Sequence, residues 1–234
     1  MRYALDAADC ADGRLFDASR GCDSFSQRLV HLAAGRSEQR VERGADELLY
    51  VLEGSGDLTV EAETVPLAPG TAGFVARGRP WRLSAEHDVT LLSVLVHEPE
   101  EAAKPFAVVD LADVEAGQAT AGREFLLGAS PQLGCASATQ FVGLIPPGRA
   151  PDHFHRYDEV IYVLAGEGLL EIGGEQASLR PGTCVHLPRT LVHCLANTGE
   201  DELRVLGVFR PAGSPAEAYY PDGTPALVAT AETV

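Results

Sequence analysis

The sequence predicts an all-β chain made of two tandem barrels, on the basis of two observations. Short β-branched runs are separated by glycine and proline, which is typical of strands joined by tight turns, and no apolar helical stretch competes with them. The chain also repeats itself, because DELLYVLEGSG (46–56) aligns with DEVIYVLAGEG (158–168) at an offset of 112 residues (158 − 46). Two copies of one all-β domain follow, with closed or sandwiched sheets that hide their strand edges.

The two copies divide the chain near its middle, into residues 1–112 and 113–234. The same offset places Pro69-Gly70-Thr71 on Pro181-Gly182-Thr183, and the alignment needs no gap from about residue 24 to 99. With 234 residues and 45% hydrophobic content, the chain can build two cores. The connector 99–125 is expected to add a strand at FAVVDL and a short helical turn.

Five apolar runs in the second copy predict strands. They are FVGLI (141–145), VIYVL (160–164), LLEI (169–172), TCVHL (183–187) and RVLGVF (204–209). A further short strand is expected to carry His193. The tail 211–234 is rich in proline, so we expect it to wrap along a barrel or a partner subunit without regular structure.

Four side chains of the second copy have the types and spacing of ligands to one metal ion. His153 and His155 are two residues apart, so on an extended strand both imidazoles point to the same side. Glu159 stands four residues after His155, and this even spacing would place it on the same face of a strand. His193 belongs to a later segment. Imidazole and carboxylate are usual ligands of divalent first-row metals and leave the ion open to substrate. The sequence therefore predicts one divalent transition metal (iron, manganese, nickel, cobalt, copper or zinc) on these four residues.

These segments resemble the paired motifs of the cupin superfamily. The matching positions are Gly148, His153, His155, Glu159 and Gly166 in the first motif, and Pro188, His193 and Asn197 in the second. Gly148 stands one residue closer to His153 than the family pattern asks, and Thr190 replaces the glycine after the proline. The resemblance implies a bicupin, with two tandem cupin barrels of the double-stranded β-helix or jelly-roll type, and it favours a homodimer. It leaves the substrate open, because the superfamily includes dioxygenases, isomerases, decarboxylases, lyases and non-catalytic binders.

The first copy is predicted to be metal-free. In the ungapped alignment Val41 replaces His153, Arg43 replaces His155 and Trp81 replaces His193, so only Glu47 keeps a ligand type. We expect Arg43 to neutralise the Glu47 carboxylate and Trp81 to fill the vacated volume. The alternative is that Glu47 is a surface acid at the start of a strand.

Charge and composition restrict the partners. A net charge of −16 argues against nucleic acid and anionic membranes, which need basic patches. The chain has no apolar run of about 18 residues, and its N-terminus carries acids where a signal peptide needs an apolar segment. Five scattered cysteines without CxxC spacing fit a reducing compartment. We therefore expect a cytoplasmic protein with a small-molecule substrate.

Basic residues lie near the predicted ligands in the sequence, and two interpretations of them stay open. Arg149, Arg156, Arg180, Arg189 and His186 can form a positive mouth that attracts an anionic substrate. Alternatively, these arginines pair with surface acids.

The predicted chemistry is that of a metal-dependent enzyme acting on a small oxygenated molecule, such as a phenol, a diketone, an organic acid or a sugar derivative. A dioxygenase-type oxidoreductase is the first hypothesis and an isomerase or lyase the second. A non-catalytic metabolite-binding cupin is the alternative class. Glu159 is a candidate catalytic base besides being a ligand, and Tyr157 is a candidate proton donor, with a water-facing turn residue as the alternative for Tyr157.

Overall fold

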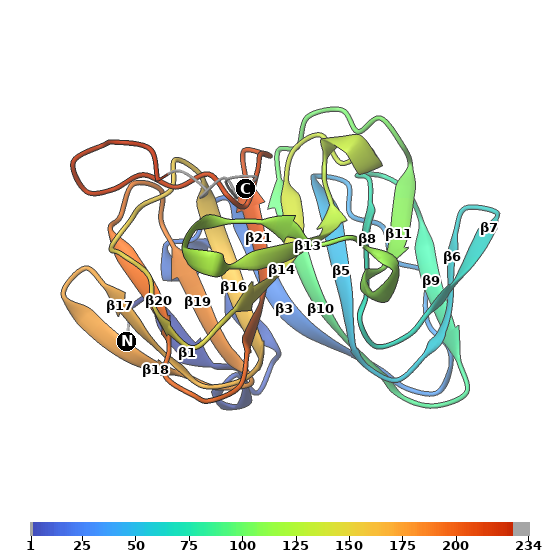
Figure 1. The fold of residues 1–234 in the computed structure, drawn as a ribbon. Helices are drawn as coiled ribbons and strands as arrows, with labels where there is room; N and C mark the ends of the chain where they lie inside the picture. Colours follow the sequence, from blue (N-terminus) through green and yellow to red (C-terminus); the bar gives the residue numbers. More distant parts are fainter. Residues whose placement is uncertain (1, 227–234) are drawn as a thin grey trace.

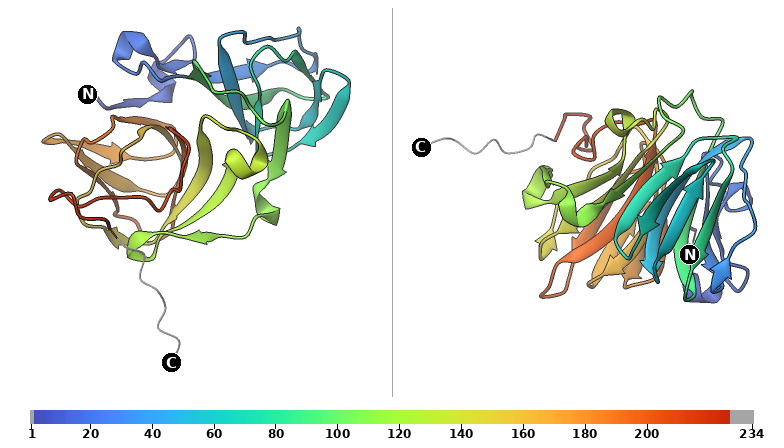
Figure 2. Two further views of the ribbon diagram at one scale, coloured as in Figure 1. Left: turned by 90° about the horizontal axis from the view of Figure 1, so that it is seen from above. Right: turned by 90° about the vertical axis from the view of Figure 1, so that its right-hand side faces the viewer.

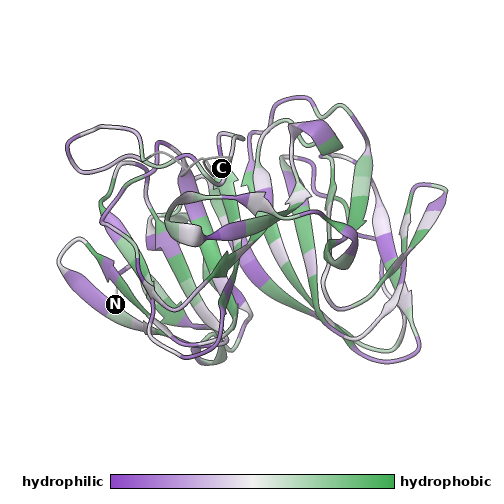
Figure 3. Ribbon diagram, viewed as in Figure 1, coloured by the Kyte–Doolittle hydropathy of each residue, from purple (hydrophilic) through white to green (hydrophobic). Residues whose placement is uncertain are grey.

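The computed structural model describes residues 2–226, which form two antiparallel β-barrels lying side by side (Figures 1 and 2). This confirms the all-β fold of two tandem barrels. Apolar residues follow the strands, and polar residues gather in the connecting loops and at the rims (Figure 3). Within residues 2–226 the helical segments are 3₁₀ turns of three residues each, and no helix is long and apolar enough to cross a membrane.

The first half of the chain contributes eleven strands. They are β1 (Ala4–Asp6), β2 (Arg14–Phe16), β3 (Phe25–Leu32), β4 (Gly35–Arg36), β5 (Ala45–Glu53), β6 (Gly56–Val60), β7 (Glu63–Leu67), β8 (Thr71–Val75), β9 (Trp81–Ala85), β10 (Val89–His97) and β11 (Phe106–Asp110). The 3₁₀ turns of this half are η1 (Ala7–Asp9), η2 (Ala18–Arg20) and η3 (Leu111–Asp113). β11 and η3 are the strand and the short turn expected in the connector.

The second half contributes ten strands. They are β12 (Gly117–Gln118), β13 (Glu124–Ala129), β14 (Thr139–Ile145), β15 (Gly148–Arg149), β16 (Asp158–Ala165), β17 (Gly168–Ile172), β18 (Glu175–Leu179), β19 (Thr183–Leu187), β20 (His193–Asn197) and β21 (Leu203–Arg210). Its 3₁₀ turns are η4 (Thr120–Gly122) and η5 (Pro131–Leu133). Each of the five apolar runs expected to be strands falls within one of these elements.

Each barrel pairs a large sheet with a four-stranded sheet. The first barrel has the orders β11-β8-β5-β10-β3-β2 and β4-β9-β6-β7, and the second has β1-β19-β16-β21-β14-β13-β12 and β15-β20-β17-β18. β1 therefore crosses from the first half of the sequence to the second barrel, where Ala4 lies opposite Val185 on β19. The predicted boundary between the two domains, at residues 112 and 113, stays a prediction.

The two large sheets pack face to face through a shared hydrophobic core. Leu48, Leu92 and Val94 of the first barrel belong to the same buried cluster as Val160 and Val208 of the second. Two buried glutamines cross this interface in a reciprocal way. Gln27 Nε2 donates to the carbonyl of Ile161 and Gln140 Nε2 to the carbonyl of Leu49, both at 3.3 Å. The repeat thus builds a pseudo-twofold pair of barrels.

The register of the strands corrects the ungapped alignment. From β6 to β9 the halves differ by 112 positions, as in Gly56 and Gly168 (168 − 56). In β4 and β15 the difference is 113, because Gly35 pairs with Ala85 as Gly148 pairs with Asn197 (148 − 35). In β10 and β21 it is 114, because Leu95 lies opposite Glu47 as Phe209 lies opposite Glu159 (209 − 95). The expectation of no gap was wrong, because loops between strands absorb single residues without disturbing the sheets.

Candidate metal centre

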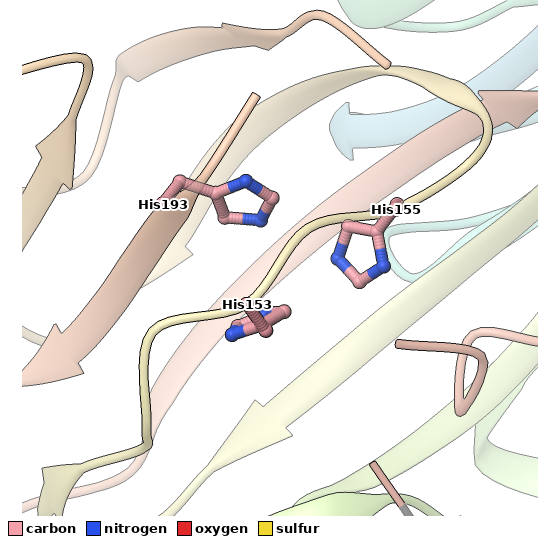
Figure 4. A group of neighbouring side chains, drawn as sticks. All are labelled: His153, His155 and His193. Carbon is pink, nitrogen blue, oxygen red and sulfur yellow. The ribbon is translucent and has the colours of Figure 1, made fainter. Parts of the chain in front are cut away.

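Three histidines of the second barrel converge on one point (Figure 4). The ligand nitrogens of His153, His155 and His193 lie within 4.8 Å of one another, and the ring centroids are 4.7–5.0 Å apart. His153 and His193 face each other across a β-bridge, with backbone N–H to carbonyl distances of 3.1 and 2.8 Å. Phe154, between the two motif histidines, points the other way and stacks on Tyr219 at 5.6 Å. The strand alternation expected from the sequence therefore sets the ligand geometry.

Backbone carbonyls orient all three rings. His153 Nδ1 donates to the Pro151 carbonyl, His155 Nδ1 to Glu217 and His193 Nδ1 to Leu191, at 2.8–2.9 Å. Because a carbonyl only accepts, each Nδ1 carries the proton and each Nε2 keeps its lone pair. His193 Nε2 is buried without a hydrogen-bond partner among the described residues. A buried, unsatisfied lone pair beside two others fits a divalent transition metal, and the carbonyl contacts are those that normally hold metal-binding histidines in place.

The electrostatics keep these imidazoles neutral. Burial lowers the pKa of His153, and it lowers the pKa of His155 to about 3, with the charge of His153 adding to the effect. Burial also lowers the pKa of His193 well below its ordinary value. Because the neutral imidazole is the form that binds metals, the three donors need no deprotonation near neutral pH.

Glu159 lines the same cavity but stands apart from the histidine cluster. The cavity opens to solvent. The Glu159 carboxylate is not within the group of donors that lie inside 4.8 Å of one another. Its Oε1 faces Gly207, where an added Cβ would come within 2.8 Å. The structure thus brings the three histidines together and places Glu159 beside them, and ligation by Glu159 stays a prediction.

Tyr157 is a buried wall of the cavity, so the alternative of a water-facing turn residue was wrong. Its ring stacks on His155 at 4.5 Å and on Phe209 at 3.9 Å. Only 4% of Tyr157 is exposed, and burial raises its pKa well above the ordinary value of a phenol. The hydroxyl therefore stays protonated at neutral pH and can donate a hydrogen bond into the cavity.

Arg123 is the cavity residue that the sequence reasoning missed. It comes from the connector, between η4 and β13, and its guanidinium donates to the carbonyl of Leu195 at 2.5 Å. Its charge lowers the pKa of each of the three histidines, and no ion pair of Arg123 is found within residues 2–226. No motif marks Arg123, because it reaches the cavity only once the connector folds across the barrel mouth.

The positive charge in the cavity does not come from the basic residues singled out from the sequence. Arg149 pairs with Glu171 and Asp152 at 2.5 and 2.6 Å, and Arg180 pairs with Asp6 at 2.5 Å. Arg156 is exposed and lies over the ring of Tyr219 at 4.1 Å. For Arg149 and Arg180 the alternative of surface ion pairs is therefore confirmed, and the cation in the cavity is Arg123.

The tail lies along the second barrel, as far as the structure describes it. Tyr219 pairs with Phe154 in a β-bridge, and Pro215 and Ala218 line the cavity. The carbonyl of Glu217 orients His155. The predicted wrapping holds for residues 211–226, and residues 227–234 lie outside the described part.

The equivalent position in the first barrel is filled by an ion-pair cluster. The bridge between Arg40 and Trp81 matches the bridge between His153 and His193, so Arg40 replaces His153. Gly78 N donates to Glu42 O as Thr190 N donates to His155 O, so Glu42 replaces His155. Val41 and Arg43 are therefore not the equivalents, because four residues separate Glu42 from Glu47 where three separate His155 from Glu159.

Glu47 is buried and neutralised, but not by Arg43, which is exposed. Trp81 Nε1 and Ser93 Oγ donate to its carboxylate at 2.8 and 2.6 Å, and Arg28 lies at 3.4 Å. The alternative of a surface acid is excluded by this burial. Trp81, 1% exposed, fills the volume as expected.

The protonation of Glu159 gives a testable pH dependence in metal-free protein. Burial, with a smaller effect of Asp158, raises the pKa of Glu159 to about 8 from 4.5. The folded state then retains a proton that the unfolded chain releases between these values, so the free energy of unfolding falls as pH rises from 4.5 to 8. Relative to Glu159→Gln, which cannot ionise, the wild-type protein should lose at most about 1.4 kcal/mol per pH unit in this window.

The measurement is urea unfolding of both proteins in excess chelator, from pH 4 to pH 9. The buried histidines act in the opposite direction between about pH 3 and pH 6.5, but they are common to both proteins and cancel in the difference. A difference that does not change with pH would show that Glu159 titrates normally.

The family model described as "Cupin domain" matches residues 28–97 and 141–209, once in each barrel. Polyketide synthase CurC of Streptomyces cyaneus is 27% identical over 123 residues, which cover 51% of this chain and 80% of that protein. L-ectoine synthase of Bordetella petrii is 32% identical over 91 residues, 38% of this chain and 68% of that protein.

Solved structures share the two-barrel fold. Protein Ylba of E. coli superposes with a TM-score of 0.72 at 15% identity, covering 88% of this chain and 89% of that chain. The oxalate decarboxylase of Lactobacillus farciminis, in a formate complex, gives 0.73 at 11% identity and covers 91% and 87%. At these identities the likeness concerns the fold alone.

Proposed function

Because the chain belongs to the cupin-domain family, with a domain in each half, we propose that it is a metal-dependent enzyme acting on a small organic acid in the second barrel. The observation that supports this most is the cavity itself. Three neutral imidazoles turn their free Nε2 atoms toward one point, and the Arg123 guanidinium lies on the same cavity wall. A divalent cation and an anionic substrate are the ligands that this combination suits.

The roles of the residues follow from their surroundings. His153, His155 and His193 would hold the ion, and Glu159 is placed to join them or to exchange a proton with the substrate. Arg123 would bind a carboxylate, since its side chain is half-buried against the barrel and has no acidic partner in the described structure. Phe125, Phe141 and Leu187 provide apolar walls for the carbon part of the substrate.

Two reaction types are proposed for this site. A bound transition metal would act as a Lewis acid or, if redox-active, support dioxygen chemistry, and a dioxygenase-type oxidoreductase is the first candidate. Lyase or isomerase chemistry is the second. It is favoured by the Glu159 carboxylate and by the protonated Tyr157, which line the same cavity as the three histidines.

The deciding experiment reconstitutes the chelated protein with iron, manganese, nickel, cobalt, copper or zinc in turn. Each form is incubated with a panel of small hydroxy acids, dicarboxylates, phenols and diketones while oxygen uptake and products are followed. Oxygen uptake that depends on iron, nickel or copper supports the dioxygenase, and turnover without oxygen supports the lyase or isomerase. Binding of a metabolite without turnover in every metal form would leave the non-catalytic class and overturn the enzyme proposal.

Arg123→Ala tests the anionic substrate. Losing one charge-assisted contact of about 1.5–3 kcal/mol should raise KM by roughly 10- to 150-fold, whereas Arg123→Lys should recover part of the loss. Arg149→Ala is the matched control, because its guanidinium pairs with Glu171 and Asp152 outside the cavity. Steady-state kinetics of the metal-loaded protein measure the effect. An unchanged KM for Arg123→Ala would mean that the substrate does not present an anion to this residue.

A further inference from the structure

A second set of potential metal ligands lies away from the histidine centre. The donor atoms of Cys22, Asp158 and His186 lie within 4.8 Å of one another, and all three residues are buried. They come from three separate parts of the chain, namely the segment before β3, the start of β16 and the end of β19. His186 Nε2 and Asp158 Oδ1 are 2.9 Å apart. Thiolate, carboxylate and imidazole are donors typical of protein-bound zinc.

The first barrel has an equivalent position for each of the three donors. Cys135 is the counterpart of Cys22, because each follows a 3₁₀ turn and a left-handed glycine, and its N–H bonds Ser130 O as that of Cys22 bonds Asp17 O, both at 3.0 Å. Asp46 corresponds to Asp158 in the strand register. At the third position the first barrel has Phe74, since Phe74 lies opposite Leu48 as His186 lies opposite Val160. An imidazole therefore stands where the copy has an apolar ring.

The aspartate also makes different contacts in the two barrels. Asp46 Oδ1 accepts the backbone N–H of Arg77 at 2.8 Å and thereby closes the loop after β8. In the second barrel the corresponding donor is Arg189 N, and no such bond to Asp158 occurs among residues 2–226. Asp158 instead directs its carboxylate at His186, beside the Cys22 thiol. His186 and Asp158 thus differ from Phe74 and Asp46, which pack in the core and close a loop in the first barrel.

We propose that Cys22, Asp158 and His186 form a second metal site, which binds one zinc ion and ties the N-terminal segment to the second barrel. Tetrahedral zinc needs its donors about 3.3–3.6 Å apart, so the carboxylate and imidazole would separate by a few tenths of an ångström and the thiolate would close in. Water can complete the coordination. The site shares no ligand with the histidine centre.

A nucleophilic cysteine does not explain this set. Burial, with the nearby charge of Asp158, raises the pKa of Cys22 to about 12, whereas a reactive cysteine needs a lowered pKa and access to solvent. The cysteine is 0% exposed. A bound dication would supply the positive charge that removes the thiol proton.

Metal stoichiometry tests the site. The full chain is stripped with chelator, reloaded with zinc, dialysed and analysed by mass spectrometry for zinc per chain. We expect two equivalents in wild type and one in Cys22→Ser and in His186→Phe, the latter copying the residue of the first barrel. Cys135→Ser, the pseudo-symmetric control, should keep two. His155→Ala should lose the other equivalent and keep this one.

Cobalt loading identifies the ligand. A thiolate ligand gives a charge-transfer absorption in the near ultraviolet, which should disappear in Cys22→Ser and in His186→Phe. It should persist in Cys194→Ser, where the thiol next to His193 donates to the Ala150 carbonyl instead. A wild-type protein that binds one equivalent, lost in His155→Ala, or that shows no thiolate band, would overturn the second site while leaving the proposed function intact.

Discussion

Replacing His155 with alanine is expected to remove one equivalent of bound metal per chain and to abolish any metal-dependent turnover. His155 supplies one of the three imidazoles whose donor nitrogens lie within 4.8 Å of one another, so its loss removes a direct ligand. Outer contacts alone change metal affinity by roughly 10- to 100-fold, so loss of a direct ligand should exceed this range. In a Cys22→Ser background, which removes the thiolate site, bound metal should fall to near zero.

The matched control is Glu42→Ala, because Glu42 occupies the position of His155 in the first barrel. Glu42 pairs with Arg28 at 2.9 Å, and neither residue contacts the histidine centre. Metal content should be unchanged in this variant, and equally in Arg43→Ala. Elemental analysis of the proteins as purified gives the answer. Equal metal loss in His155→Ala and Glu42→Ala would contradict a single histidine centre in the second barrel.

Replacing Trp81 with alanine is expected to lower the free energy of unfolding by about 3–5 kcal/mol, the usual cost of deleting a fully buried aromatic side chain. The indole is 1% exposed and fills the place that His193 and the predicted ion take in the other barrel. Its N–H also bonds Glu47 Oε2 at 2.8 Å. The variant therefore opens a cavity and removes a donor from a buried carboxylate.

Trp81→Phe separates these two contributions, because it keeps most of the volume and removes the N–H donor. The phenylalanine variant should lose about 1–3 kcal/mol, which is the cost of an unsatisfied buried acceptor. Arg43→Ala, at an exposed residue, should stay within about 0.5 kcal/mol of wild type. Urea unfolding followed by tryptophan-independent circular dichroism measures all three. A loss below about 1 kcal/mol in Trp81→Ala would show that the first barrel does not depend on this core.

The sequence determined the fold and the place where the three histidines come together. A strand period of two, turn residues at regular intervals and an internal repeat were enough to predict two all-β barrels. His153 and His155 could be placed on one side of a strand because side chains alternate. These are local properties of the backbone, so they can be deduced without knowing which strands meet.

Single-residue differences between the copies could not be deduced in the same way. With one more residue between Glu42 and Glu47 than between His155 and Glu159, the arginines beside Glu47 are Arg28 at 3.4 Å and Arg40 at 3.9 Å, and Arg43 is not among them. A repeat aligned on its strongest segment gives no signal of where a loop has gained a residue. The hydrogen-bonded register reveals it, because pairing across the sheet is fixed by both strands together.

What lines the cavity was decided by the tertiary structure alone. Arg123 enters from the connector and Ala218 from the tail, so residues nearly a hundred positions apart meet at the barrel mouth. Likewise Cys22 reaches Asp158 and His186 because the N-terminal segment packs on the second barrel. The local sequence pattern specifies which segments form strands and on which face of a strand each side chain lies. The contacts between distant segments depend instead on how two packed sheets bury their apolar faces, which no short stretch of sequence contains.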